Sequence, residues 1–194
     1  MKQLDDFAEI GTDVTIYSTA KLIGRERICI GSHVIIDDFV FIGNQRKLMI
    51  GHHVHIACHA SITGGGICIC CDFSGISSGA RILTGTDHFQ GGGLSGPTIP
   101  EKYRSLDRGR VVIGAHAIIG ANSVVLPNIE VGEGVTVGAG SVVTKNLEPW
   151  GIYAGVPARR IGTRSSDEIL AFEQKLVEEE KIGTRRFRTA EALL

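Results

Sequence analysis

Two histidines stand where a proton could be moved during a reaction. His88 lies in the run Thr84-Gly85-Thr86-Asp87-His88-Phe89, at the entrance of a long irregular segment, and His55 lies in the run His55-Ile56-Ala57. Histidine titrates nearest to neutral pH, so it is the usual general base for an acceptor that loses a proton as it attacks. We take His88 as the first candidate for a catalytic base and His55 as the reserve. Asp87, next to His88, is the candidate substrate-binding residue.

The other histidines and the cysteines carry weaker signals. We expect the remaining five histidines to be exposed residues outside the repeat corners and without a catalytic role: His33, His52, His53, His59 and His116. The five cysteines are an odd number, and four lie in repeat-like segments. We therefore expect reduced thiols that pack as small hydrophobic side chains.

A period of six residues organises the elements that position these candidates. Between Val111 and Lys145 an aliphatic residue recurs at every sixth place, at Ile113, Ile119, Val125, Val131, Val137 and Val143. Neither the helical period of 3.6 nor simple alternation produces this pattern. Hexapeptide repeats predict a parallel β-helix, in which stacked coils bury each other's apolar interior. The aliphatic-Gly-x-x-small-x form resembles the left-handed hexapeptide β-helix family.

The repeat begins at Ile10-Gly11 and predicts about six coils. Ile69 is expected to open the fourth coil, with one inserted residue at Gly75. We predict an all-β domain over residues 1–162, with a loop at 86–110 inserted, followed by a C-terminal helix and tail over 163–194. The helix is expected from Ser165 to about Lys181, because Ser165 and Glu168 fit a capping box. Its apolar stripe is Ile169, Phe172, Leu176 and Val177.

Composition limits the partners. The chain has 194 residues and a formal net charge of -1 without a basic block, so nucleic acids and anionic membranes are not expected partners. The first residues lack an apolar stretch long enough for a signal or a membrane span. A cytoplasmic location is the resulting expectation.

Val111 to Ile161 carries three motifs that resemble the xenobiotic and sugar O-acetyltransferases of the hexapeptide family, such as galactoside and maltose acetyltransferases. They are Ile-Gly-Ala-His-Ala-Ile-Ile-Gly-Ala, Val-Gly-Ala-Gly-Ser-Val-Val-Thr-Lys and Ala-Gly-Val-Pro-Ala-Arg. The resemblance implies acetyl-CoA as co-substrate, no metal, and a homotrimer with its sites in the clefts between subunits. It also implies that Ala121 and Ala139 line the pantetheine channel. Thr144, Lys145 and Arg159 would meet the nucleotide end, where cations hold phosphate by charge-assisted hydrogen bonds.

The chain also resembles a subgroup of sugar-modifying acetyltransferases, through His55-Ile56-Ala57, Gly64-Gly65-Gly66, Asp72-Phe73, Asp87-His88-Phe89 and the run from Pro97 to Tyr103. We therefore expect direct transfer of an acetyl group to a saccharide hydroxyl, with a histidine base. The alternative is N-acetylation of an amino sugar or nucleotide-linked amino sugar. It ranks second because nothing resembles an added N-terminal sugar-nucleotide domain.

Two other classes remain as rivals. The γ-class carbonic anhydrases share the β-helix and bind zinc through three histidines, for which His55, His59 and His88 are the available set. That reading leaves the Thr144-Lys145 motif unexplained. A β-helix serving only as a trimeric scaffold is the third reading, and the long loop with its histidine argues against it.

Overall fold

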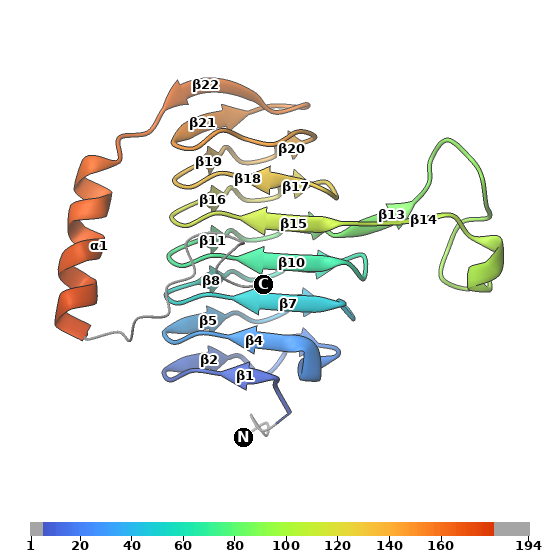
Figure 1. Cartoon of the computed structure of the whole chain (residues 1–194), viewed down its shortest axis with the longest axis horizontal. Coiled ribbons are helices and arrows are strands. Elements are labelled where there is room, and N and C mark those ends of the chain that lie inside the picture. Colours follow the sequence, from blue (N-terminus) through green and yellow to red (C-terminus); the bar gives the residue numbers. More distant parts are fainter. Residues whose placement is uncertain (1–5, 181–194) are drawn as a thin grey trace.

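The computed structural model describes residues 6–180, which form a three-sided prism of stacked coils (Figure 1). Sheet A contains β1 (Glu9–Ile10), β4 (Ile28–Ile30), β7 (Lys47–Ile50), β10 (Ile67–Cys70), β15 (Arg110–Ile113) and β18 (Glu130–Val131). Sheet B contains β2 (Val14–Ile16), β5 (Val34–Ile36), β8 (His55–Ile56), β11 (Gly75–Ile76), β16 (Ile118–Ile119), β19 (Thr136–Val137), β21 (Gly151–Ala154) and β22 (Arg159–Thr163). Sheet C contains β3 (Lys21–Leu22), β6 (Phe41–Ile42), β9 (Ser61–Thr63), β12 (Arg81–Leu83), β17 (Val124–Val125) and β20 (Val142–Val143).

The coiling is left-handed, as the resemblance implies. In Figure 1 the strands of sheet A cross the front from right to left while the chain climbs from the N-terminus. Sheets A and C each have one strand in every complete coil, and sheet B continues with β21, which pairs in parallel with β19. The described chain therefore has six complete coils, as the repeat predicts, and the beginning of a seventh.

The interior consists of columns of identical or similar side chains. One column on sheet B places Ile56, Ile76 and Ile119 in register, and each is at most 1% exposed. Almost all of the apolar surface of each such side chain is removed from water, and this burial stabilises the fold by about 1.5–3 kcal/mol per side chain. The strict period of six is thus a direct consequence of packing between neighbouring coils.

The fourth coil departs from the expected register. Cys70, not Ile69, aligns with Ile50 and Ile113 and points into the prism. Gly75 pairs with His55 and Ile118 without an inserted residue. The extra residues lie instead at the corner between sheets C and A, where Gly64 has φ +113° and an added Cβ would meet the Gly85 amide at 2.2 Å. The other early coils also have two extra residues at this corner.

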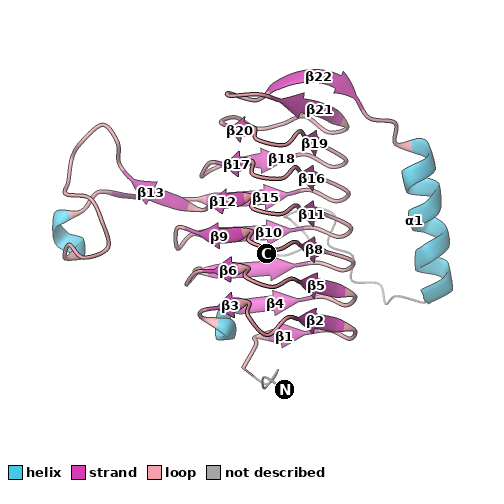
Figure 2. Cartoon of the chain, turned by 180° about the vertical axis from the view of Figure 1, so that it is seen from behind, coloured by secondary structure: helices cyan, strands magenta, loops and turns pink. Residues whose placement is uncertain are grey.

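The longest insertion at the C–A corner forms an arm. Its base is an antiparallel pair, β13 (Gly85–Asp87) with β14 (Leu106–Arg108), and it includes a short 3₁₀ helix, η2 (Glu101–Tyr103). The arm extends away from the prism in both views (Figures 1 and 2). A smaller 3₁₀ turn, η1 (Arg25–Arg27), fills the same corner near the N-terminus. The predicted loop at 86–110 is therefore an ordered projection.

Helix α1 (Asp167–Glu180) runs beside the corner between sheets A and B, on the side opposite to the arm (Figure 2). It begins two residues after the predicted start, and the Ser166 hydroxyl donates to Asp167 Oδ1 at 3.0 Å in place of the expected capping box. The predicted stripe is wrong at one position, because Phe172 is 66% exposed and its neighbour Glu173 is buried. None of the helices in the described part of the chain has the length and apolarity that crossing a membrane requires.

Candidate active site

His88 stands on the arm, just after β13. Its backbone amide donates to the Ser105 carbonyl at 2.9 Å, and its Nδ1 lies 2.9 Å from the Gly91 carbonyl. A carbonyl only accepts, so Nδ1 carries the proton and the neutral ring keeps its lone pair on Nε2. The side chain is exposed, and Phe89 beside it is 90% exposed. The Gly91 carbonyl thus fixes the orientation of the His88 ring and leaves Nε2 exposed at the surface of the arm.

Asp87 holds the arm together. Its Oδ1 accepts from Arg104 Nη2 at 2.9 Å, and its Oδ2 accepts from the Gly96 amide at 2.8 Å. The Arg104 guanidinium, followed by the Gly96 amide, keeps the pKa of this carboxyl below its ordinary value of 3.8. Both oxygens are engaged in the free chain, so contact with a substrate through Asp87 remains a proposal.

The lowered pKa of Asp87 predicts how the arm responds to acid. A depressed folded pKa gives a contribution that is present above the unfolded value and is lost as the pH falls through the folded value. The Gly96 amide should therefore report, in an NMR titration, a midpoint below 3.8. Arg104→Gln should raise that midpoint, while Arg108→Gln, which removes a bond to Glu101 instead, should leave it unchanged. A midpoint at or above 3.8 in the unaltered protein would contradict this account.

His55, the reserve candidate, has a carboxylate partner. It projects from sheet B on β8, and its Nε2 lies 3.0 Å from Asp37 Oδ2. The Asp37 carboxylate accepts a hydrogen bond from Nε2–H, so in the neutral ring Nδ1 is the nitrogen with the free lone pair. Its side chain is 54% exposed. The arm and β8 lie on opposite sides of the prism (Figures 1 and 2), so the two candidate bases are not brought together in one chain.

The five candidate cofactor residues lie on the last coils. Ala121 and Ala139 occupy the corner between sheets B and C in consecutive coils, joined by the bond from the Gly140 amide to the Ala121 carbonyl at 2.8 Å. Thr144 and Lys145 follow β20 and are exposed. Arg159 opens β22 and is tied to sheet C, because the Ala158 amide donates to the Val142 carbonyl at 2.8 Å. The fold therefore places all five candidates on the last coils, with the side chains of Lys145 and Arg159 exposed.

A stack of rings along the A–B corner was not predicted. His33, His53, Phe73 and His116 succeed one another with centroid separations of 4.7–5.0 Å and nearly parallel planes. All four have positive φ, the conformation of the corner residue. Their common signal in the sequence is the spacing of 20 residues between His33, His53 and Phe73, which equals the length of an early coil.

The expectation that the remaining five histidines are exposed is correct for His59 alone, because His33, His52 and His53 are half-buried. His116 departs furthest from the expectation. It is 6% exposed, and its Nε2 lies 3.0 Å from Glu173 Oε2 of helix α1, which is also buried. Trp150 continues the stack at 6.2 Å from His116, over the space left by Gly134. Trp150 therefore packs along the A–B corner, beside which helix α1 runs.

The zinc reading receives no support from the arrangement of histidines. Among residues 6–180, the group of possible ligands whose donor atoms lie within 4.8 Å of one another is His33, His53 and Glu180. His55, His59 and His88 do not form such a group within one chain. The candidate site therefore remains the arm with its histidine and the cofactor candidates on the last coils.

Comparison with known proteins shows which family of enzymes the chain is similar to. Residues 110–145 match the family described as bacterial transferase hexapeptide (six repeats). The chain is 36% identical over 160 residues to a dTDP-4-amino-4,6-dideoxy-D-glucose acyltransferase of Escherichia coli, covering 82% of this chain and 83% of that protein. It is 32% identical over 143 residues to the putative lipopolysaccharide biosynthesis O-acetyl transferase WbbJ of Escherichia coli K12, covering 71% of this chain and 61% of that protein.

A solved structure extends the comparison to bound ligands. AntD, an N-acyltransferase from Bacillus cereus crystallised with dTDP and 3-hydroxybutyryl-CoA, superposes with a TM-score of 0.84 at 36% identity. The match covers 91% of this chain and 93% of AntD. A maltose O-acetyltransferase from Clostridium difficile 630 matches at 19% identity with a TM-score of 0.56 and shares the fold.

Proposed function

Because the chain belongs to the hexapeptide-repeat family of sugar acyltransferases, which use an acyl-CoA as co-substrate, we propose that it acylates an amino group on a dTDP-linked 4-amino-4,6-dideoxyhexose. The observation that carries the proposal is the similarity to AntD over nine-tenths of both chains. AntD is an N-acyltransferase and was crystallised with dTDP and an acyl-CoA. The Escherichia coli relative is named for the same kind of acceptor.

The proposal replaces a hydroxyl by an amine as the favoured acceptor. The sequence argument against an amine was that no separate sugar-nucleotide domain is recognisable. AntD is 93% covered by this chain and binds dTDP, so a β-helix of this size needs no such domain. The O-acetyl reading rests on the similarity to WbbJ, which covers 61% of that protein. The similarity to AntD covers more of both chains than the similarity to WbbJ, and this favours an amine as the acceptor.

The chemistry assigned to the site is direct transfer. The acceptor nitrogen attacks the thioester carbonyl, the carbon–sulfur bond breaks, and the departing thiolate takes up a proton. Nε2 of His88 is the proposed acceptor of the proton that the nitrogen loses, since its Nδ1 is engaged with the Gly91 carbonyl. Backbone N–H groups are the donors expected to face the oxyanion that forms at the carbonyl. Asp87 would act by fixing the arm that carries His88 and by meeting the sugar.

We propose a homotrimer as the active form. His88 and the 90% exposed Phe89 follow β13 on the arm, which extends away from the prism (Figure 1), so a neighbouring chain would complete the pocket. Closed cyclic symmetry suits a prism with flat faces. Light scattering should give about three times the chain mass of 20.7 kDa. A fully active monomer would rule out a site shared between subunits.

Lys145 and Arg159 are proposed to hold the phosphates of the acyl-CoA. Lys145→Ala and Arg159→Ala should each raise the KM for acyl-CoA by the equivalent of about 1–3 kcal/mol, because each removes a charge-assisted contact. The KM for the acceptor should change little. The matched control is Lys21→Ala. Lys21 is an exposed lysine on β3 of sheet C, the sheet that also contains β20 before Lys145, but it lies in the first coil. Unchanged acyl-CoA saturation in both variants would refute the assignment.

Binding of dTDP tests the proposed substrate class without requiring turnover. Calorimetry of the full chain with dTDP, in the presence of CoA, should show a saturable site. UDP lacks the thymine methyl group and carries ribose in place of 2′-deoxyribose, so it should bind more weakly. Absence of dTDP binding, with CoA binding intact, would leave an acyltransferase whose acceptor is not a dTDP-sugar.

A further inference from the structure

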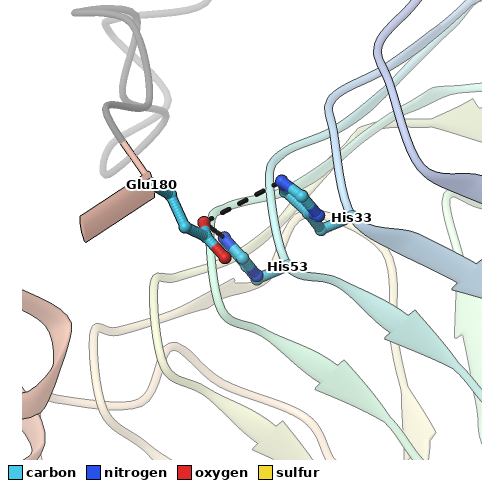
Figure 3. A group of neighbouring side chains, drawn as sticks. All are labelled: His33, His53 and Glu180. Atoms are coloured by element: carbon cyan, nitrogen blue, oxygen red, sulfur yellow. Dashed lines mark hydrogen bonds and ion pairs between the residues drawn. The ribbon is translucent and has the colours of Figure 1, made fainter. Parts of the chain in front are cut away.

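The end of helix α1 meets the first rings of the corner stack. His33 and His53 project from consecutive coils, and both rings point toward Glu180 at the end of the described helix (Figure 3). Glu180 Oε2 lies 2.9 Å from His53 Nε2 and 3.8 Å from His33 Nε2. The three side chains are 17–32% exposed, so an ion from solvent can reach them. This cluster is separate from the arm and from the cofactor candidates.

The His33 ring lies between two carboxylates, those of Asp13 and Glu180. Its Nδ1 lies 3.4 Å from Asp13 Oδ2, an acceptor that favours the proton on Nδ1. Its Nε2 faces the Glu180 carboxylate oxygen from 3.8 Å, which is beyond hydrogen-bonding distance. A metal ion placed between these two atoms would bond to both of them.

We propose that His33, His53 and Glu180 bind a divalent transition-metal ion of the zinc class, which fastens the end of helix α1 to the first coils. Two imidazoles and one carboxylate are a ligand set that zinc accepts, with the fourth position open to water. A tetrahedral ion at 2.0–2.1 Å from each ligand requires ligand atoms about 3.3 Å apart. The distances of 2.9 Å and 3.8 Å from Glu180 lie on either side of that value.

The stack supplies both the spacing and the support of this site. The ring centroids of His33 and His53 are 4.7 Å apart with planes at 9°, so a small tilt brings the two Nε2 atoms together. Phe73 supports His53 from the far side at 5.0 Å. Asp13, at the same corner one coil below, holds the other nitrogen of His33, as outer carboxylates do for metal-bound histidines. The ligands thus belong to rigid coils, apart from the one on the helix.

Calorimetric titration of the metal-free full chain with ZnCl₂ tests the proposal. We expect one site that Glu180→Gln and His33→Ala weaken by more than the roughly 10–100-fold typical of an outer-shell change. Asp13→Asn should weaken it about tenfold, the low end of that range, because Asp13 is exposed. The matched control is His59→Ala, whose ring is likewise stacked, on Phe39 at 5.0 Å, in a positive-φ corner.

Two further readouts keep the result interpretable. Glu180→Gln leaves the ring stack intact, so its far-ultraviolet circular dichroism and unfolding temperature without metal should match the unaltered protein. Zn²⁺ should raise the unfolding temperature of the unaltered protein and of His59→Ala, and not that of Glu180→Gln. The Co²⁺ complex should show visible bands without a thiolate charge-transfer band. Absent Zn²⁺ binding, binding unchanged by Glu180→Gln, or a thiolate band would each overturn the proposal.

Discussion

Replacing His88 by alanine should lower kcat for acyl transfer by roughly 10²–10⁴-fold, the usual contribution of a general base. The affinity for CoA should stay nearly unchanged, because the base acts on the acceptor. We expect the loss of kcat because the Gly91 carbonyl accepts a hydrogen bond from His88 Nδ1–H, which leaves Nε2 able to accept a proton from the acceptor. Initial rates, with calorimetric CoA binding, provide the measurement.

The pH dependence sharpens this prediction for an amine acceptor. An amine that has already lost its extra proton attacks without help, so the cost of removing His88 should shrink as the pH rises. A hydroxyl acceptor would show no such recovery. His55→Ala is the matched variant, since His55 is also oriented, through Asp37, but stands on sheet B. An inactive His55→Ala beside an active His88→Ala would transfer the role of base to His55.

Replacing Glu173 by alanine should destabilise the fold by about 3 kcal/mol, where the ranges for an unsatisfied buried polar group and for a broken buried ion pair meet. The carboxylate is 6% exposed and pairs with His116, which is equally buried. Without it, the imidazole loses its partner in a place that water does not reach. Urea unfolding followed by circular dichroism measures the change.

Glu173→Gln separates the roles of charge and hydrogen bonding at this pair. Glutamine fills the same volume and retains an acceptor for His116 Nε2, so its loss should be smaller than that of alanine. Glu178→Ala, on the exposed side of the same helix, is the control for helix propensity. Equal stability of Glu173→Ala and Glu178→Ala would show that the buried pair contributes nothing.

The prism was predictable because each coil packs on its neighbours through the same positions. Once Ile119 and Val125 are six residues apart, every interior side chain between Val111 and Lys145 is set by the repeat. The fourth coil was misread because Cys70 replaces an aliphatic residue there and Ile69 beside it is also apolar. Periodicity alone cannot distinguish two neighbouring apolar residues, whereas pairing with Ile50 and Ile113 does.

The helix and the candidate site show what a period does not determine. Contacts of Glu173 and Glu180 join residues 57 and 127 positions apart, on an element whose place against the coils is not set by any repeat. The motifs indicated His88, Lys145 and Arg159 by resemblance. Their placement relative to one another depends on the arm and, in our proposal, on a second chain. The repeat of a single chain does not determine how far His88 of one subunit lies from the cofactor candidates of another.

The central claim is that the chain transfers an acyl group to an amine on a dTDP-linked sugar. The most direct measurement compares kcat/KM for two acceptors that differ only at C4, dTDP-4-amino-4,6-dideoxyglucose and its 4-hydroxy counterpart, with acetyl-CoA or 3-hydroxybutyryl-CoA as donor. We expect release of free CoA with the amine and a product whose acyl group resists alkaline hydroxylamine, which cleaves oxygen esters but leaves amides intact. Faster turnover of the hydroxyl acceptor, giving a product that hydroxylamine cleaves, would contradict the account.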